Sequence, residues 1–222
     1  MPTPIRTALL DLIATHSFRL GDFTLASGQR SDYYIDCRTT TLHAEGGRLA
    51  GILFYDLIRQ YMPTAVAVGG LTMGADPLVS NTASASAWAL AEYVETLEIS
   101  AELELDGDDD PGLPPALIHG FLVRKAEKQH GTGRRIEGFC RAGARVVIVD
   151  DVCTTGASTI NALEAAREAG MTVAAVVCIV EREEANGRPA VVAAAAGAPF
   201  LRLFSAAEVR TEHVKQLSAA TS

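Results

Sequence analysis

Apolar residues recur at helical spacing in several stretches of the chain, and each stretch predicts a helix: 5–16, 45–61, 76–99, 159–170 and 205–217. Short continuous apolar runs predict buried strands between them: 65–70, 118–124, 145–150, 173–180 and 200–204. Strands of this kind that alternate with helices indicate an α/β fold, in which a parallel central sheet is flanked by helices.

Two regions depart from the alternation. Residues 18–36 look extended, with a turn at Ser27–Gly28, and we interpret residues 1–44 as an N-terminal helix and small cap. The α/β core would then occupy residues 45–222. Within it, residues 101–116 are acidic and then rich in proline and glycine, which predicts an exposed surface excursion of no assigned role.

Composition narrows the class of protein. The chain has 222 residues, of which 48% are hydrophobic, and this suits one α/β domain with a small appendage. A net charge of −8 argues against nucleic-acid binding, and no apolar run is long enough to span a bilayer. The four cysteines form no CxxC pair, so we expect reduced thiols and a cytoplasmic location.

The segment 146–158, VVIVDDVCTTGAS, ends a predicted strand and begins a helix. Ligands of parallel sheets bind at the carboxyl ends of the strands, and a helix N-terminus supplies unpaired amides that suit a phosphate. The hydroxyls of the loop can donate to the same phosphate. Asp150 and Asp151 would repel a phosphate but can accept hydrogen bonds from sugar hydroxyls, so the segment predicts a sugar phosphate site.

Other kinds of phosphate site fit this segment less well. A nucleotide-binding P-loop requires GxxxxGK[ST], and no lysine is present here. A dinucleotide fingerprint requires GxGxxG, whereas this loop has one glycine. A plain strand–turn–helix with a threonine or serine cap stays open as the less favoured alternative.

A second segment, 124–138, is basic on an acidic chain. Its five basic residues against two glutamates give a local charge of +3, and it holds two of the three lysines of the chain. Glycines at 131 and 133 favour a mobile loop. Such a loop at the end of a strand is suited to closing as a lid over pyrophosphate and excluding water.

These segments resemble a known family. The 146–158 pattern is similar to the motif of type I phosphoribosyltransferases that binds 5-phosphoribosyl 1-diphosphate (PRPP). RKxxKxHG at 124–131 resembles the catalytic loop of orotate phosphoribosyltransferases, and so do FTLASGQRSDYYID and GGLTMGADP. The resemblance runs from about residue 18 to the end of the chain.

The resemblance implies the type I phosphoribosyltransferase fold and transfer of the phosphoribosyl group from PRPP to orotate, a step of pyrimidine biosynthesis. It implies a homodimer that shares the 124–138 loop across its interface, and Mg²⁺ held mainly by PRPP rather than by a protein metal site. Catalysis is implied for Lys125, Lys128 and His130, and orotate binding for Thr154, Arg182, Tyr34 and Ile35. The residues implied to bind PRPP are Arg124, Lys125, Lys128, His130, Asp150, Asp151, Val152, Cys153, Thr154, Thr155, Gly156, Ala157 and Ser158.

Two positions depart from the family. Ala26 and Met73 stand where many members have lysine, and Arg30 is a candidate to replace the first of these. Two alternatives remain: a phosphoribosyltransferase for another base, such as a purine or uracil, and a regulator that binds PRPP without catalysis. The basic loop and Arg182 argue against the first alternative, and the lack of a basic nucleic-acid surface argues against the second.

Overall fold

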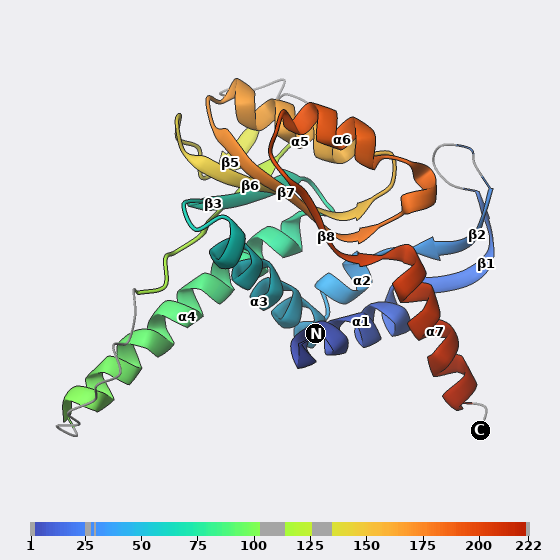
Figure 1. Cartoon of the computed structure of the whole chain (residues 1–222), viewed down its shortest axis with the longest axis horizontal. Helices are drawn as coiled ribbons and strands as arrows, with labels where there is room; N and C mark the ends of the chain where they lie inside the picture. Colours follow the sequence, from blue (N-terminus) through green and yellow to red (C-terminus); the bar gives the residue numbers. More distant parts are fainter. Residues whose placement is uncertain (1–2, 25–27, 29, 103–113, 126–134, 221–222) are drawn as a thin grey trace.

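A six-stranded sheet lies at the centre of the computed structural model, which describes residues 3–24, 28, 30–102, 114–125 and 135–220 (Figure 1). The strand order is β5-β4-β3-β6-β7-β8, and every neighbouring pair is parallel except β4 and β5. The strands are β3 (Ala67–Leu71), β4 (His119–Val123), β5 (Ile136–Gly138), β6 (Arg145–Cys153), β7 (Thr172–Glu181) and β8 (Phe200–Ser205). The predicted α/β architecture is confirmed, with one antiparallel edge strand added.

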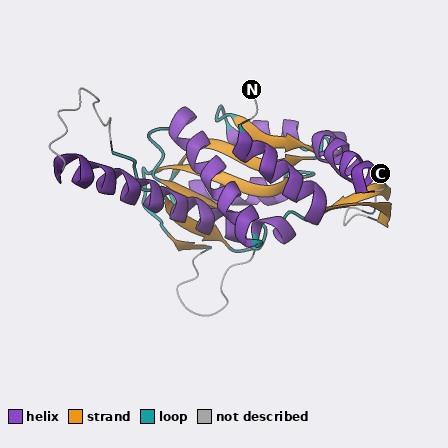
Figure 2. Cartoon of the chain, turned by 90° about the horizontal axis from the view of Figure 1, so that it is seen from below, coloured by secondary structure: helices purple, strands orange, loops and turns teal. Residues whose placement is uncertain are grey.

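Helices cover both faces of the sheet (Figure 2). They are α1 (Pro4–His16), α2 (Arg38–Thr41), α3 (Ala44–Tyr61), α4 (Asp76–Glu102), α5 (Ala157–Glu168), α6 (Arg188–Ala195) and α7 (Ala206–Ala220), with a 3-10 turn η1 (Glu183–Ala185). Within the described residues, none of these helices combines the length and the apolarity that crossing a membrane requires.

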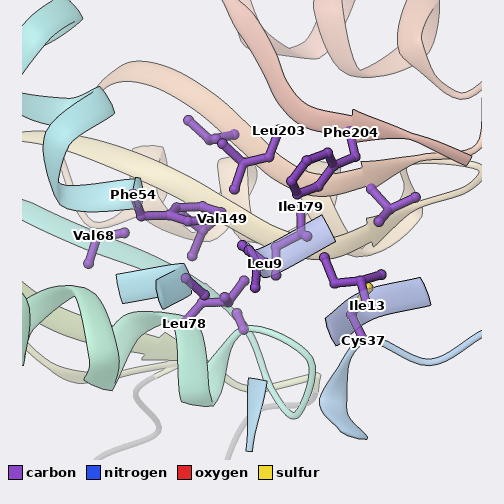
Figure 3. Close-up of a cluster of buried hydrophobic side chains, with 14 of the residues drawn as sticks. Leu9, Ile13, Cys37, Phe54, Val68, Leu78, Val149, Ile179, Leu203 and Phe204 are labelled. Carbon is purple, nitrogen blue, oxygen red and sulfur yellow. The ribbon is translucent and has the colours of Figure 1, made fainter. Parts of the chain in front are cut away.

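Strand β6 carries apolar side chains on both faces of the sheet, so both faces must be covered by helices. Alternate side chains of a strand point to opposite faces, so Val147 and Val149 enter one apolar core while Val146 and Ile148 enter the other. The first core lies against α1, α3, α4 and α7, and Figure 3 shows part of it around Phe54 and Ile179. The second core lies against α5 and α6. This two-sided burial fixes the register of β6, and with it the position of the residues at its carboxyl end.

An N-terminal hairpin of β1 (Phe18–Thr24) and β2 (Arg30–Ile35) stands beside the sheet. Its turn residues 25–27 and 29 lie outside the described part of the chain. Asp32 of the hairpin pairs with Arg210 of α7 at 2.8 Å, and Phe18 stacks on Tyr33 with ring centroids 5.2 Å apart. The hairpin is therefore joined to the C-terminal helix as well as to its own apolar contacts.

Several predicted boundaries were wrong. Strand β6 continues to Cys153, three residues beyond the predicted end at Asp150, so Asp151 lies within the strand rather than after it. Helix α5 begins at Ala157, two residues before the predicted start at 159, and α4 extends through Glu102 into the predicted excursion. The sequence pattern predicted no element at α2, β5 or α6. Residues 103–113 of the excursion lie outside the described residues.

Candidate functional site

A cavity of about 840 Å³ opens where β3, β4, β6 and β7 end. Its walls come from three chain segments, 34–38, 71–74 and 150–158, and two single residues. The lining residues are Tyr34, Ile35, Asp36, Arg38, Leu71, Thr72, Met73, Gly74, Lys125, Asp150, Asp151, Val152, Thr154, Thr155, Ser158 and Arg182. Because the strands are parallel, their carboxyl ends meet at one edge of the sheet, and residues distant in sequence converge there.

Asp150 and Asp151 form the acidic wall of the cavity. The Asp150 carboxylate is 6% exposed and accepts hydrogen bonds from the Thr159 hydroxyl at 2.6 Å and from the Asp151 backbone amide at 3.1 Å. Burial, and next the charge of Asp151, raise the pKa of Asp150 to about 7. Burial also raises the pKa of Asp151. The pair is therefore costly to ionise without a ligand that donates hydrogen bonds to it.

Gly74 packs against Asp151 in the acidic wall of the cavity. A Cβ atom at this position would lie 2.4 Å from Oδ1 of Asp151, which is closer than real contacts allow. Thr72, Met73 and Gly74 line the cavity, and the Thr72–Met73 peptide is cis. The glycine thus lets the β3–α4 connection approach the acids closely.

A loop of small residues lies between β6 and α5. Gly156 is the N-cap of α5 with φ +80°, and a Cβ atom there would lie 2.3 Å from Cγ2 of Val191. Thr154, Thr155 and Ser158 line the cavity, and the first turn of α5 contains no acidic residue. Hydroxyls next to the positive end of a helix dipole form a site that suits a phosphate group.

Arg182 lines the cavity directly after β7, and Tyr34 and Ile35 at the end of β2 also line it. The Arg182 side chain is 6% exposed, and Nε donates to the Tyr33 hydroxyl at 3.0 Å. Nη2 donates to the Ser31 hydroxyl at 3.0 Å, and the guanidinium lies 4.4 Å from the centroid of the Tyr33 ring. A buried arginine held in this way can receive a carboxylate in two-point contact.

Asp36 and Arg38 are cavity residues that the sequence analysis missed. Arg38 donates to both oxygens of Asp36, at 2.8 and 2.7 Å, and these bonds lower the pKa of Asp36. A carboxylate two residues before an arginine, at the end of an extended stretch, is the only trace of this pair in the sequence. The pair adds one fixed charge of each sign beside the acids of β6.

The basic loop is described only at its two ends. Lys125 lines the cavity, while Arg124 pairs with Glu137 at 2.8 Å. Lys128 and His130 lie outside the described residues. The loop was predicted to run through residue 138, but its last residues form the edge strand β5, which pairs with β4.

The remaining candidates are residues that do not line the cavity and the positions where many members of the family have lysine. Cys153 is buried in the apolar core beneath the sheet end, and Gly156 and Ala157 form the start of α5. Arg30, the candidate to replace a lysine, pairs with Asp22 across the hairpin and is not among the lining residues. Ala26 lies outside the described residues, whereas Met73 lines the cavity and is 67% exposed.

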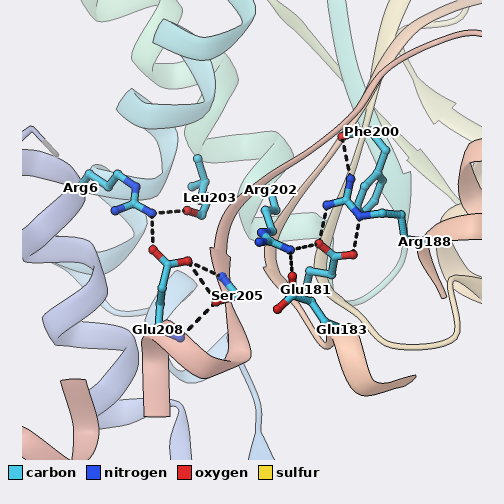
Figure 4. A network of polar contacts seen from close by, with 9 residues as sticks. All are labelled: Arg6, Glu181, Glu183, Arg188, Phe200, Arg202, Leu203, Ser205 and Glu208. Carbon is cyan, nitrogen blue, oxygen red and sulfur yellow. Dashed lines mark hydrogen bonds and ion pairs between the residues drawn. The ribbon is translucent and has the colours of Figure 1, made fainter. Parts of the chain in front are cut away.

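A network of ion pairs surrounds the buried Glu181, the residue before Arg182 (Figure 4). Glu181, which precedes Arg182, is 3% exposed and accepts hydrogen bonds from Arg188 and Arg202. Burial opposes its ionisation, but the bonds from Arg188 and then Arg202 outweigh burial and lower the pKa of Glu181. The network joins the end of β7, directly before Arg182, to the start of α6, whose Val191 lies against Gly156 in the loop between β6 and α5.

Comparisons with known proteins agree with one another. The family model described as "Phosphoribosyl transferase domain" matches residues 122–193. A protein named orotate phosphoribosyltransferase from Thermosynechococcus vestitus is 40% identical over 206 residues, covering 92% of this chain and 93% of that protein. A protein of the same name from Rhodopseudomonas palustris (strain TIE-1) is 39% identical over 207 residues, covering 91% and 95%.

A solved structure shares the arrangement of the fold. The crystal structure of Mycobacterium tuberculosis H37Rv orotate phosphoribosyltransferase in complex with Fe(III) dicitrate superposes with a TM-score of 0.69. It is 32% identical, and the match covers 93% of this chain and 99% of that chain. The complex of the same enzyme with PRPP gives a TM-score of 0.66 at 29% identity.

Proposed function

This chain belongs to the orotate phosphoribosyltransferase family, whose members transfer the phosphoribosyl group of PRPP to orotate, and we propose how its residues divide that reaction. The observation that carries the proposal is the cavity itself. One space of about 840 Å³ is lined by the acids Asp150 and Asp151, the hydroxyls that precede and begin α5, and the guanidinium of Arg182. These groups are complementary to a ribose, a phosphate and a carboxylated base, respectively.

PRPP binding falls to the β6–α5 junction. We assign the 5′-phosphate to the loop Thr154–Ser158, which we call the phosphate loop, where α5 amides and side-chain hydroxyls converge. Asp150 and Asp151 accept hydrogen bonds from the ribose hydroxyls, and Val152 and Cys153 carry the strand into the loop. The two carboxylates also favour the positive charge that develops on the ribose as the C1–oxygen bond to pyrophosphate breaks.

We assign orotate to the part of the cavity that Arg182 lines. Arg182 receives its carboxylate, Thr154 reaches the ring, and Tyr34 and Ile35 contact the faces of the base. The ring nitrogen of orotate attacks C1 of the ribose, so the new bond forms as pyrophosphate departs. No side chain of the site needs to form a covalent intermediate with the sugar.

The departing pyrophosphate requires positive charge. Lys125 already lines the cavity, and we assign Arg124, Lys128 and His130 to the same task, with Lys128 or His130 protonating the leaving group. The 124–138 loop of each subunit would act in the site of its partner within a homodimer. Four cysteines without a disulfide fit a cytoplasmic enzyme.

Mg²⁺ is the expected cofactor, carried mainly by PRPP. Mg²⁺ typically uses one or two carboxylates together with substrate phosphates, and the carboxylates that line this cavity are those of Asp150, Asp151 and Asp36, the last of which is paired with Arg38. The donor set therefore fits a metal that arrives with its substrate. When bound, the ion would neutralise charge on the pyrophosphate.

The test is an assay of the purified protein with PRPP, Mg²⁺ and separate bases. Orotate should be consumed and pyrophosphate released, while uracil and hypoxanthine should react at least about a hundredfold more slowly, because neither offers a carboxylate to Arg182. Reaction with uracil or hypoxanthine, and none with orotate, would overturn the assignment of the base.

A further inference from the structure

Arg182 is held by three neighbours whose roles no comparison assigns. Its Nε donates to the Tyr33 hydroxyl at 3.0 Å and to Oε1 of Glu184 at 3.1 Å, and its Nη2 donates to the Ser31 hydroxyl at 3.0 Å. Ser31 and Tyr33 come from β2, while Glu184 lies in η1 directly after β7. Two elements far apart in the sequence therefore converge on one guanidinium.

The hydroxyl protons in this group are all committed. The Tyr33 hydroxyl donates to Glu184, and the Ser31 hydroxyl donates to the backbone carbonyl of Tyr33 at 2.8 Å. A hydroxyl has one proton to donate, so both oxygens face Arg182 only as acceptors. The group can thus hold a guanidinium in one orientation and has no spare proton with which to bind an anion itself.

The same contacts determine which edge of Arg182 is presented. They use the Nε proton and one proton of Nη2. Of the five protons of a guanidinium, this leaves the end formed by Nη1 and the second proton of Nη2, and Arg182 is one of the cavity-lining residues. That end matches a carboxylate in two-point contact.

Packing makes the arrangement rigid. The guanidinium lies 4.4 Å from the centroid of the Tyr33 ring, and that ring stacks on Phe18 at 5.2 Å. Tyr33 and Arg182 are 7% and 6% exposed. A long arginine side chain loses much conformational freedom when a ligand binds it, and an arginine that is already fixed avoids that cost.

We propose that Ser31, Tyr33 and Glu184 are positioning residues that fix Arg182 for a carboxylated base and so set the base selectivity of the enzyme. The inference rests on the proposed function, since it assumes that Arg182 receives the carboxylate of orotate. It adds residues outside the cavity lining to the determinants of specificity.

Tyr33→Phe tests the proposal because it removes one hydroxyl and keeps the stacked ring. The KM for orotate should rise about tenfold, equivalent to about 1.4 kcal/mol, while the KM for PRPP stays within about twofold. Ser31→Ala, at a less buried position, should shift the same constant in the same direction. Tyr61→Phe, on a side chain that is 64% exposed, is the matched control and should change neither constant.

A double-mutant cycle separates positioning from a general structural role. In the Arg182→Lys background, Tyr33→Phe should have no further effect on the KM for orotate, because the group that it positions is gone. Additive effects, equal increases in both KM values, or an unchanged KM for orotate in both single variants would overturn the proposal. A wild-type enzyme that does not use orotate would instead overturn the proposed function.

Discussion

Asp150 and Asp151 are adjacent in sequence but occupy different environments. Both line the cavity, but Thr159 and a backbone amide already donate to the two oxygens of Asp150, whereas Asp151 lies against Gly74. Burial raises the pKa of both carboxyls, and the charge of Asp151 raises that of Asp150 further. In the proposed complex, a ribose that donates its hydroxyls to these carboxylates would offset the cost of ionising them.

This environment predicts how stability depends on pH. The pKa of Asp150 is raised to about 7 in the folded protein and is about 3.9 in the unfolded chain. Between these values the folded state binds more protons than the unfolded state, so its free energy of unfolding falls as pH rises. Asp150→Asn lacks this titration, and its stability relative to the wild type should rise by about 2 kcal/mol between pH 5 and pH 8.

Chemical denaturation at the two pH values measures this difference. Glu164→Gln, which removes one exposed carboxylate from α5, controls for the loss of a negative charge. A stability difference between Asp150→Asn and the wild type that is the same at pH 5 and pH 8 would contradict the raised pKa. Adding ribose 5-phosphate should stabilise the wild type more than Asp150→Asn at pH 8.

Gly156 lies at the junction of β6 and α5, where we proposed the 5′-phosphate site. Gly156 adopts φ +80° at the N-cap of α5, and Val191 of α6 occupies the space where a side chain would lie. Gly156→Ala therefore introduces backbone strain and a steric clash together. We expect it to lower the free energy of unfolding by about 2–4 kcal/mol and to weaken binding of ribose 5-phosphate at least about tenfold.

Gly143→Ala is the matched control for that variant. Gly143 has φ +78°, but no heavy atom lies within 4 Å of the position of its added Cβ. It should therefore cost only the strain of the left-handed backbone, about 1 kcal/mol, and leave ribose 5-phosphate binding unchanged. Equal losses of stability in the two variants would show that Val191 does not confine the phosphate loop.

The elements predicted from sequence are those with a strong apolar pattern. Long apolar runs such as 173–180 predict buried strands, and the pattern of 146–158 predicts a sugar phosphate site. Helix α2 has four residues and β5 has three, too few to establish a period. Helix α6 lies in an alanine-rich stretch, and its pattern does not distinguish a helix from a buried strand.

The missed site residues depend on tertiary structure. Asp36 and Arg38 are close in sequence, but folding brings them to the cavity, and folding also brings Tyr33 of β2 to Arg182 and Glu184. Tyr33 and Arg182 are 149 residues apart in the sequence. No local spacing reports such a pair, whereas the phosphate loop is continuous in the chain and could be recognised from its residues alone.

At the scale of the whole molecule, the sheet divides the protein into two apolar cores and gathers the ligand groups at one edge. The ends of the basic loop leave from that edge: Arg124 follows β4 and Arg135 precedes β5. Arg135 is anchored on α5 by Glu168 at 2.7 Å and Asn161 at 3.0 Å. Arg124 pairs with Glu137 and, among the described residues, is not one that lines the cavity of its own chain.

We assigned Arg124 to pyrophosphate, yet in the described structure it does not line the cavity of its own chain, which fits a loop that serves the neighbouring subunit. Arg124→Ala and Asp151→Ala should each lose most activity as pure homodimers. When the two are mixed and allowed to exchange subunits, half of the dimers are hybrids, and each hybrid combines one intact Asp151 site with an intact Arg124 loop. Activity should then recover to about a quarter of the wild-type value at equal mixing, because one of the two sites in each hybrid is complete.

Mixing Asp151→Ala with an Asp150→Ala variant is the control, since both defects then lie in the site of their own chain and every arrangement leaves only damaged sites. Steady-state release of pyrophosphate measures both mixtures, and recovery no greater than in the control would place the loop in the site of its own subunit.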